Sequence, residues 1–233
     1  MEKISINARY IGEYAFSGCT ALSDVTIQDT VETIDAGAFA NTAITEIIIP
    51  ASVKNIIGGY SVGAFSSCYN LKTVTILGKL DSLGKNTFMS CSALESVYLE
   101  GVGSLSGSYI FAGCKKLKSI TIKQSAAPTI GEYTMGDSSY GYAGTDVPAG
   151  EKFLYVPEGA TGYTSSYWNS RVLSSSYCGF QLQEIEYSKT TTIYIDQSIS
   201  DPSTMITRTV DEGAIEAIRK NSHRYVGTYD EST

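Results

Sequence analysis

The residue types best able to do chemistry in this chain are five cysteines and a single histidine, His223. Four of the cysteines follow a phenylalanine by three residues, and these are Cys19, Cys68, Cys91 and Cys114. The fifth, Cys178, lies outside this spacing and has no assigned role. Cysteines can bind metal ions or form disulfides, and a histidine can act as a general base or a pH-sensitive group.

The regular spacing of the cysteines argues against metal and disulfide chemistry. If the Phe-x-x-Cys units stack as coils, neighbouring cysteines lie on adjacent rungs about 4.7–4.9 Å apart. Parallel side chains then keep their Cβ atoms at about that distance, whereas a disulfide needs about 3.8 Å. A straight ladder also spreads ligands that a metal site must bring together. We therefore predict buried thiols that pack as small apolar groups.

The remaining candidates lack the neighbours that catalysis needs. His223 stands beside Arg224 after a predicted helix, a position that suits a polar residue because of the helix dipole. No sequence pattern around Asp196 and Asp201 indicates that the two carboxylates form an acid–base pair. The glycines at 58–59 and 101–103 lack the lysine and the strand–loop–helix context of a phosphate-binding loop. We predict a non-enzymatic protein with no catalytic residue, no metal site and no cofactor.

Composition excludes two further classes of function. The chain of 233 residues carries 17 Lys and Arg against 24 Asp and Glu, a net charge of −7, which argues against nucleic-acid binding. No segment approaches the roughly 18 consecutive apolar residues of a membrane helix. Residues 1–6 lack the continuous apolar core of a signal peptide. Either the protein is not exported by that route, or a signal was removed or lies outside this chain.

The elements that position these residues form an internal repeat of about 23 residues. Its phenylalanines are Phe16, Phe39, Phe65, Phe88 and Phe111. Each unit continues with an apolar residue, a short alternating strand of the form V-x-I, a polar turn and a second pair of the form V-x-x-I. Alternation points both apolar residues of a strand to one face. One unit cannot bury that face alone, so we predict stacked coils with a continuous core.

These units resemble the BspA-type, or treponemal-type, leucine-rich repeats of bacterial surface proteins, over about residues 4–130. Tyr14-Ala15-Phe16, Gly37-Ala38-Phe39 and Gly63-Ala64-Phe65 fit the family pattern well, whereas the units of Phe88 and Phe111 depart from it at the alanine. The resemblance implies a right-handed, β-rich leucine-rich-repeat solenoid with a parallel sheet.

Two regions are predicted along the chain. Residues 1–178 form the repeat domain, with a strand at 153–157 and an aromatic-rich closing unit in which Trp168 covers the last coil. Residues 179–233 form a small C-terminal α+β region or linker, which we expect to be incomplete, with a strand at 190–195 and a helix at about 211–221. Within it, residues 201–225 resemble tail-appendage proteins of phages and prophages from gut bacteria, more weakly than the repeats resemble their family.

The candidate binding residues lie on two surfaces. Strand side chains that point away from the core form rows across the sheet, and exposed apolar groups rimmed by carboxylates can mark a contact surface. The residues selected on this face are Glu46, Ile48, Thr75, Leu77, Tyr98 and Glu100. The rival site is a tyrosine-rich insertion that contains Tyr140 and Tyr142, because long loops on solenoids carry recognition.

Together these features predict a non-enzymatic recognition or adhesion module of a bacterial cell-surface protein from a gut bacterium. Its partner would be an extracellular protein or glycan, and its location extracellular or at the cell surface. The alternative is a receptor-binding or structural part of a phage tail appendage, located on the virion. The ligand and the oligomeric state are left open, because fold does not determine function.

Overall fold

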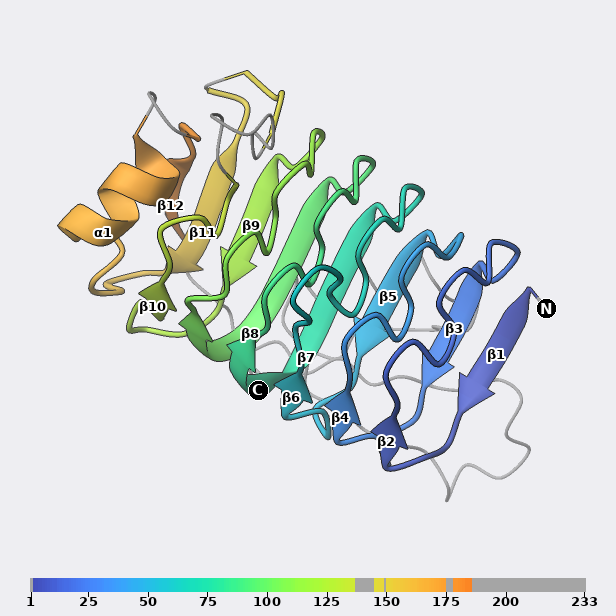
Figure 1. Ribbon diagram of the computed structural model, residues 1–233. Coiled ribbons are helices and arrows are strands. Elements are labelled where there is room, and N and C mark those ends of the chain that lie inside the picture. Colours follow the sequence, from blue (N-terminus) through green and yellow to red (C-terminus); the bar gives the residue numbers. More distant parts are fainter. Residues whose placement is uncertain (1, 137–144, 149, 175–177, 186–233) are drawn as a thin grey trace, which may run out of the picture. The chain divides into compact units, whose positions relative to one another are not determined.

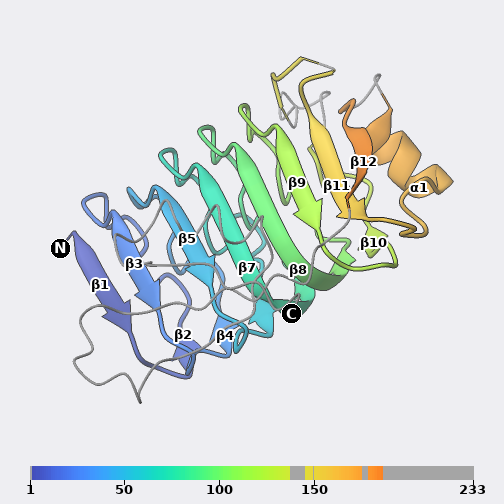
Figure 2. The same ribbon diagram turned by 180° about the vertical axis from the view of Figure 1, so that it is seen from behind.

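The computed structural model describes residues 2–136, 145–148, 150–174 and 178–185, all within one compact unit that ends at Ile185. Its main feature is a row of parallel strands that lie side by side in chain order (Figures 1 and 2). The row consists of β1 (Lys3–Ile6), β3 (Asp24–Ile27), β5 (Glu46–Ile49), β7 (Thr73–Leu83), β8 (Ser96–Leu105), β9 (Ser119–Ile122), β11 (Phe153–Pro157) and β12 (Gln181–Ile185). This arrangement confirms the predicted leucine-rich-repeat solenoid.

A second row of short parallel strands follows the polar turns. It consists of β2 (Tyr10–Ile11), β4 (Thr33–Ile34), β6 (Asn55–Ile56), the ends of β7 and β8, and β10 (Thr129–Ile130). Ile11, Ile34 and Ile56 point inward and are buried. The second apolar pair of each repeat therefore closes the core from the other side, as its spacing predicts.

The polar turn predicted in every unit is missing from two of them, and this expectation is wrong for β7 and β8. Both strands run on from the main row into the second row, with a bulge in β7 between Ile76 and Lys79. The reason is local sequence. Turn-forming Asp29 and Pro50 interrupt the first units, whereas the chain after Ile76 continues to bury alternate residues as far as Leu80, and Leu83 is buried three residues later.

The core is a ladder of aromatic rings. Phe16, Phe39, Phe65, Phe88 and Phe111 stack in order, with ring centroids 5.4, 5.2, 5.6 and 5.8 Å apart and interplanar angles of 9–17°. Offset stacking at this separation is favourable beyond the apolar area it buries. One coil of about 23 residues therefore places each phenylalanine ring against the ring of the next coil.

A second ladder consists of residues with left-handed backbone, two positions after each phenylalanine. These residues are Gly18, Asn41, Ser67, Ser90 and Gly113, with φ between +56° and +73°. Glycine and asparagine tolerate this conformation better than other residues. In the four later units the turn it creates directs the next residue toward the core, and these residues are Thr42, Cys68, Cys91 and Cys114.

The C-terminal end of the described solenoid is covered by a short lid. α1 (Ser166–Trp168) is followed by a π-helical turn, η2 (Asn169–Leu173). Trp168 is buried there, its Nε1 donates to the Pro128 carbonyl at 3.0 Å, and its ring meets Tyr163 edge-on at 5.2 Å. This confirms the predicted role of Trp168. Beyond residue 178, β12 pairs with β11 in parallel, so the sheet continues past the position chosen as the domain boundary.

Candidate functional site

The buried thiols act as hydrogen-bond donors between coils. Cys68, Cys91 and Cys114 donate to the carbonyls of the phenylalanines one coil earlier, at 3.1, 3.1 and 3.2 Å. All three are fully buried, as predicted. In the unit without cysteine, the Thr42 hydroxyl donates to the Phe39 carbonyl at 2.9 Å.

The prediction of burial is wrong for Cys19, which is exposed. Its unit is the first rung of the ladder, and Phe16 stacks on one ring only. Cys19 therefore has a neighbouring coil on one side, whereas Cys68, Cys91 and Cys114 have one on each side.

The protonation of the thiols follows from their surroundings. Burial raises the pKa of Cys91 and of Cys114 well above the usual thiol value, because the interior disfavours the thiolate. A hydrogen bond with Cys91 lowers the pKa of Cys68. Outside the ladder, burial raises the pKa of Cys178 to about 12. The raised pKa values of Cys91, Cys114 and Cys178 suit packing and hydrogen bonding rather than nucleophilic chemistry.

Gly58 allows close packing against the next coil, and Gly59 allows a tight turn within its own coil. A Cβ atom at Gly58 would lie 2.0 Å from the Lys85 backbone nitrogen, and one at Gly59 would lie 2.4 Å from the Val62 carbonyl oxygen. Among the described residues no group of acidic, histidine and cysteine side chains could hold a metal ion. His223, Asp196 and Asp201 lie outside the described part of the chain. Within that part, no helix is both long and apolar enough to span a membrane.

The main row of strands brings the selected sheet residues together. Ile48, Thr75 and Tyr98 are register partners on β5, β7 and β8, and the row continues to Thr121 on β9. Glu46 begins the neighbouring row, while Leu77 and Glu100 follow the paired residues Ile76 and Leu99. We call the surface formed by Glu46, Ile48, Thr75, Leu77, Tyr98 and Glu100 the sheet face.

The sheet face is less open than its sequence pattern predicts. Ile48 and Leu77 are partly exposed, but the exposed fraction is 5% for Tyr98 and 1% for Thr75. The expectation that these two side chains are exposed is therefore wrong. The Tyr98 ring lies between the rungs of Thr75 and Thr121, and its hydroxyl donates to Glu100 at 2.8 Å. Neighbours on closely spaced rungs and this bond hold the ring against the sheet.

Two aromatic members of the same rows were missed by the sequence reasoning. Phe153 pairs in register with Ser119, and Tyr155 pairs with Thr121. Their rings lie 5.8 Å apart, and both side chains are partly exposed. The signal was available, because Phe153 and Tyr155 alternate with the buried Leu154. The strand was predicted, but its outward residues were not added to the rows.

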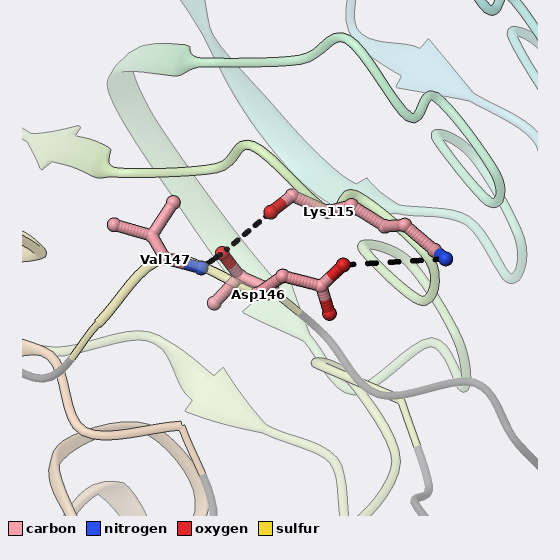
Figure 3. Close-up of polar contacts among 4 residues, drawn as sticks. Lys115, Asp146 and Val147 are labelled. Carbon is pink, nitrogen blue, oxygen red and sulfur yellow. Dashed lines mark hydrogen bonds and ion pairs between the residues drawn. The ribbon is translucent and has the colours of Figure 1, made fainter.

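The tyrosine-rich insertion is described only at its ends, and Tyr140 and Tyr142 lie outside the described residues. Figure 3 shows where the chain returns to the solenoid. The Asp146 backbone nitrogen donates to the Lys115 carbonyl at 2.8 Å, and the Thr145 hydroxyl donates to the Leu117 carbonyl at 2.9 Å. The exposed ion pair between Lys115 and Asp146, at 4.0 Å, contributes little stability. Hydrogen bonds to two backbone carbonyls therefore dock this segment on the coil before β9.

The family assignment follows from the repeat. The family model for the BspA type leucine rich repeat region matches residues 1–101 and 60–140, with six copies. The chain belongs to the BspA-type leucine-rich-repeat family. The matching family and the three solved structures below include no phage appendage protein. Residues 201–225, which carry that weak resemblance, lie outside the described part of the chain.

Three solved structures show similarity to this chain. A leucine rich cell surface protein from Faecalibacterium prausnitzii A2-165 is 22% identical, with a TM-score of 0.33, and the match covers 81% of this chain and 60% of that one. The pneumococcal vaccine antigen PcpA is 16% identical, with a TM-score of 0.25 and coverage of 80% and 68%. A leucine-rich repeat protein from Bacteroides ovatus is 17% identical, with a TM-score of 0.21 and coverage of 79% and 72%. The search of curated proteins found no match.

Proposed function

We propose that this chain is a non-enzymatic recognition or adhesion module of a bacterial cell-surface protein, binding an extracellular protein or glycan through the sheet face. The observation that carries the proposal is the unbroken register, from β5 to β12, of the two outward rows that contain Glu46 and Ile48. A rigid sheet fixes the distances between contact residues before a partner arrives. Preorganisation of this kind lowers the entropy cost of binding. Family membership supports a repeat module, because such repeats occur in surface proteins.

The chemistry of the sheet face suits a partner with both apolar and polar contacts. Glu100 accepts from the Tyr98 hydroxyl and lies 3.7 Å from the Lys123 ammonium, so its carboxylate is held in place from two directions. Ile48 and Leu77 supply apolar area nearby. An apolar centre with oriented charges at its rim is the usual composition of a protein-binding surface.

The proposal is tested by a binding screen of the purified chain against extracellular proteins, surface glycans and bacterial cells. For a partner found in this way, Ile48→Ala and Glu100→Ala are each expected to weaken binding about tenfold or more. Tyr98→Phe keeps the buried ring and removes the hydroxyl that donates to Glu100, so we expect a smaller loss.

The matched control is Thr26→Ala, a change at the same strand position on β3, which lies outside the sheet face. Thermal unfolding of each variant separates lost contacts from lost folding. Unchanged affinity for the Ile48 and Glu100 variants, with the fold intact, would exclude the sheet face as the binding surface.

A further inference from the structure

We propose a second binding site for a neutral carbohydrate, in a cleft along the turns of the first three coils. The cleft has a volume of about 550 Å³ and is lined by residues that include Asn7, Arg9, Thr30, Glu32, Ser52 and Lys54. These residues belong to the connections from β1 to β2, from β3 to β4 and from β5 to β6. We call it the turn cleft. Its size lies in the range of small-molecule sites, about 300–1,000 Å³.

The first argument is a buried hydroxyl without a partner. Ser52 Oγ is shielded from solvent and has no hydrogen-bond partner among the described residues. Buried polar groups are nearly always paired, so an exception calls for an explanation. Ser52 lines the turn cleft, and because no hydrogen bond holds its hydroxyl inward, rotation about the Cα–Cβ bond can turn Oγ toward a ligand hydroxyl, to which it can donate and from which it can accept.

The second argument is the balance of charge. Arg9 and Lys54 oppose Asp29 and Glu32 in the lining, two positive against two negative groups. The Arg9 Nε donates to Glu32 at 2.9 Å, and the Lys54 ammonium donates to the Ala51 carbonyl at 2.9 Å. An anionic ligand would meet the two carboxylates and a cationic ligand the two basic groups. A neutral ligand rich in hydroxyls avoids both repulsions and can use donors and acceptors alike.

The third argument is that the lining is held in position. The Thr30 hydroxyl donates to Asn7 Oδ1 at 2.9 Å, which holds these two side chains together. The turn carrying Ser52 is closed by a bond from the Val53 nitrogen to the Pro50 carbonyl at 3.1 Å. A Cβ atom at Gly78 of β7 would lie 2.8 Å from the Ala51 carbonyl oxygen, so β7 packs directly against this turn. Polar groups fixed in this way need little reordering to bind.

The turn cleft exists because the repeats differ. Only where a turn separates the two strand rows do the polar connections stack side by side. In β7 and β8 the strand runs through both rows instead, and β7 carries a bulge between Ile76 and Lys79. The site is therefore separate from the sheet face, whose residues lie on the strands themselves.

The test uses an array of neutral oligosaccharides beside sialylated and sulfated ones, followed by titration calorimetry of the purified full chain with the best neutral binder. Wild type is expected to bind neutral oligosaccharides. Arg9→Ala and Ser52→Ala are each expected to weaken this binding about tenfold. Ser52→Ala is expected to leave the melting temperature equal or higher, because it removes an unpaired buried hydroxyl; a melting temperature that falls would show a structural role and overturn the inference.

The matched control is Lys118→Ala. Lys118 and Glu95 form an ion pair at 2.7 Å that joins residues 23 positions apart, like the pair of Arg9 and Glu32, but outside the turn cleft. Its loss is expected to leave carbohydrate binding unchanged. Absence of neutral binders, wild-type affinity in both cleft variants, or binding lost in Ile48→Ala instead would each overturn the turn cleft. The last of these results would leave the sheet face as the binding surface.

Discussion

At the scale of single residues, the thiols in this core are structural donors. Cys91 and Cys114 each donate to a carbonyl one coil earlier, and the interior around them favours the neutral form. Alanine at either position would remove the donor and leave a small cavity. Serine would keep a donor in place of the thiol.

The raised pKa values predict that alkaline pH destabilises the fold. Below about pH 9 the Cys114 thiol is protonated in both states, and its contribution is fully present. Above that value the unfolded chain loses the proton while the folded chain keeps it, so the free energy of unfolding falls by about 1.4 kcal/mol per pH unit for each such thiol. Urea unfolding between about pH 8 and pH 10.5 is the measurement.

The control is Cys114→Ala, which lowers stability at every pH but removes one titrating group. We expect a shallower decline with pH in this variant than in wild type. Equal slopes would mean that the thiol titrates normally in the folded state.

The left-handed ladder shows what sequence reasoning reached at this scale and what it missed. Spacing alone predicted the rings and three of the buried thiols. It did not identify Asn41, Ser67 and Ser90 as residues with positive φ, although they share a position with Gly18 and Gly113. The glycine in two units was the available signal. Ser67 and Ser90 do not indicate a positive φ from sequence, because serine has no strong preference for that conformation.

At the scale of elements, the correct and the incorrect predictions both come from applying one repeat pattern to every unit. The strands were predictable because each buries alternate residues, as Val25 and Ile27 do. The continuous β7 and β8 were not predicted, because a turn was extended from the first units to all of them. The sheet face was predicted as a set of rows, but the burial of Tyr98 was not, because spacing along one strand does not show how a large ring lies against neighbouring strands.

The stacked rings predict a graded response to truncation. Phe65 is fully buried between two rings, so Phe65→Ala is expected to lower the free energy of unfolding by about 3–5 kcal/mol. Phe16 is only partly buried and has one stacked neighbour, and the matched change Phe16→Ala should cost clearly less. Urea unfolding followed by circular dichroism measures both. Similar losses would show that stacking along the ladder does not determine the contribution of each ring.

At the scale of the whole described unit, stability is distributed along one axis. Each coil contacts mainly its neighbours, so the solenoid resembles a line of coupled units rather than a single core. The lid at one end contains the single tryptophan of the chain, Trp168. Its fluorescence therefore reports the local state of the last coil, whereas circular dichroism reports the whole sheet.

This arrangement predicts that a defect far from the lid separates the two signals. Phe39→Ala lies near the opposite end, and we expect it to move the circular dichroism midpoint in urea more than the Trp168 fluorescence midpoint. Tyr163→Ala, beside Trp168, should shift the fluorescence transition first. Coincident transitions in both variants would instead indicate one fully cooperative unit.

The thiol-to-carbonyl bonds also give the stack a direction. Each of Cys68, Cys91 and Cys114 needs a phenylalanine carbonyl on the coil before it, and each of those carbonyls is used by the coil after it. A gene duplication or exchange that preserves the 23-residue phase, such as that between Phe65 and Phe88, would supply both members of a new pair at once. A duplication or exchange that changes this phase would leave a thiol donor and a carbonyl acceptor unpaired in the interior. The chain can therefore grow or shorten by whole coils far more readily than by single residues.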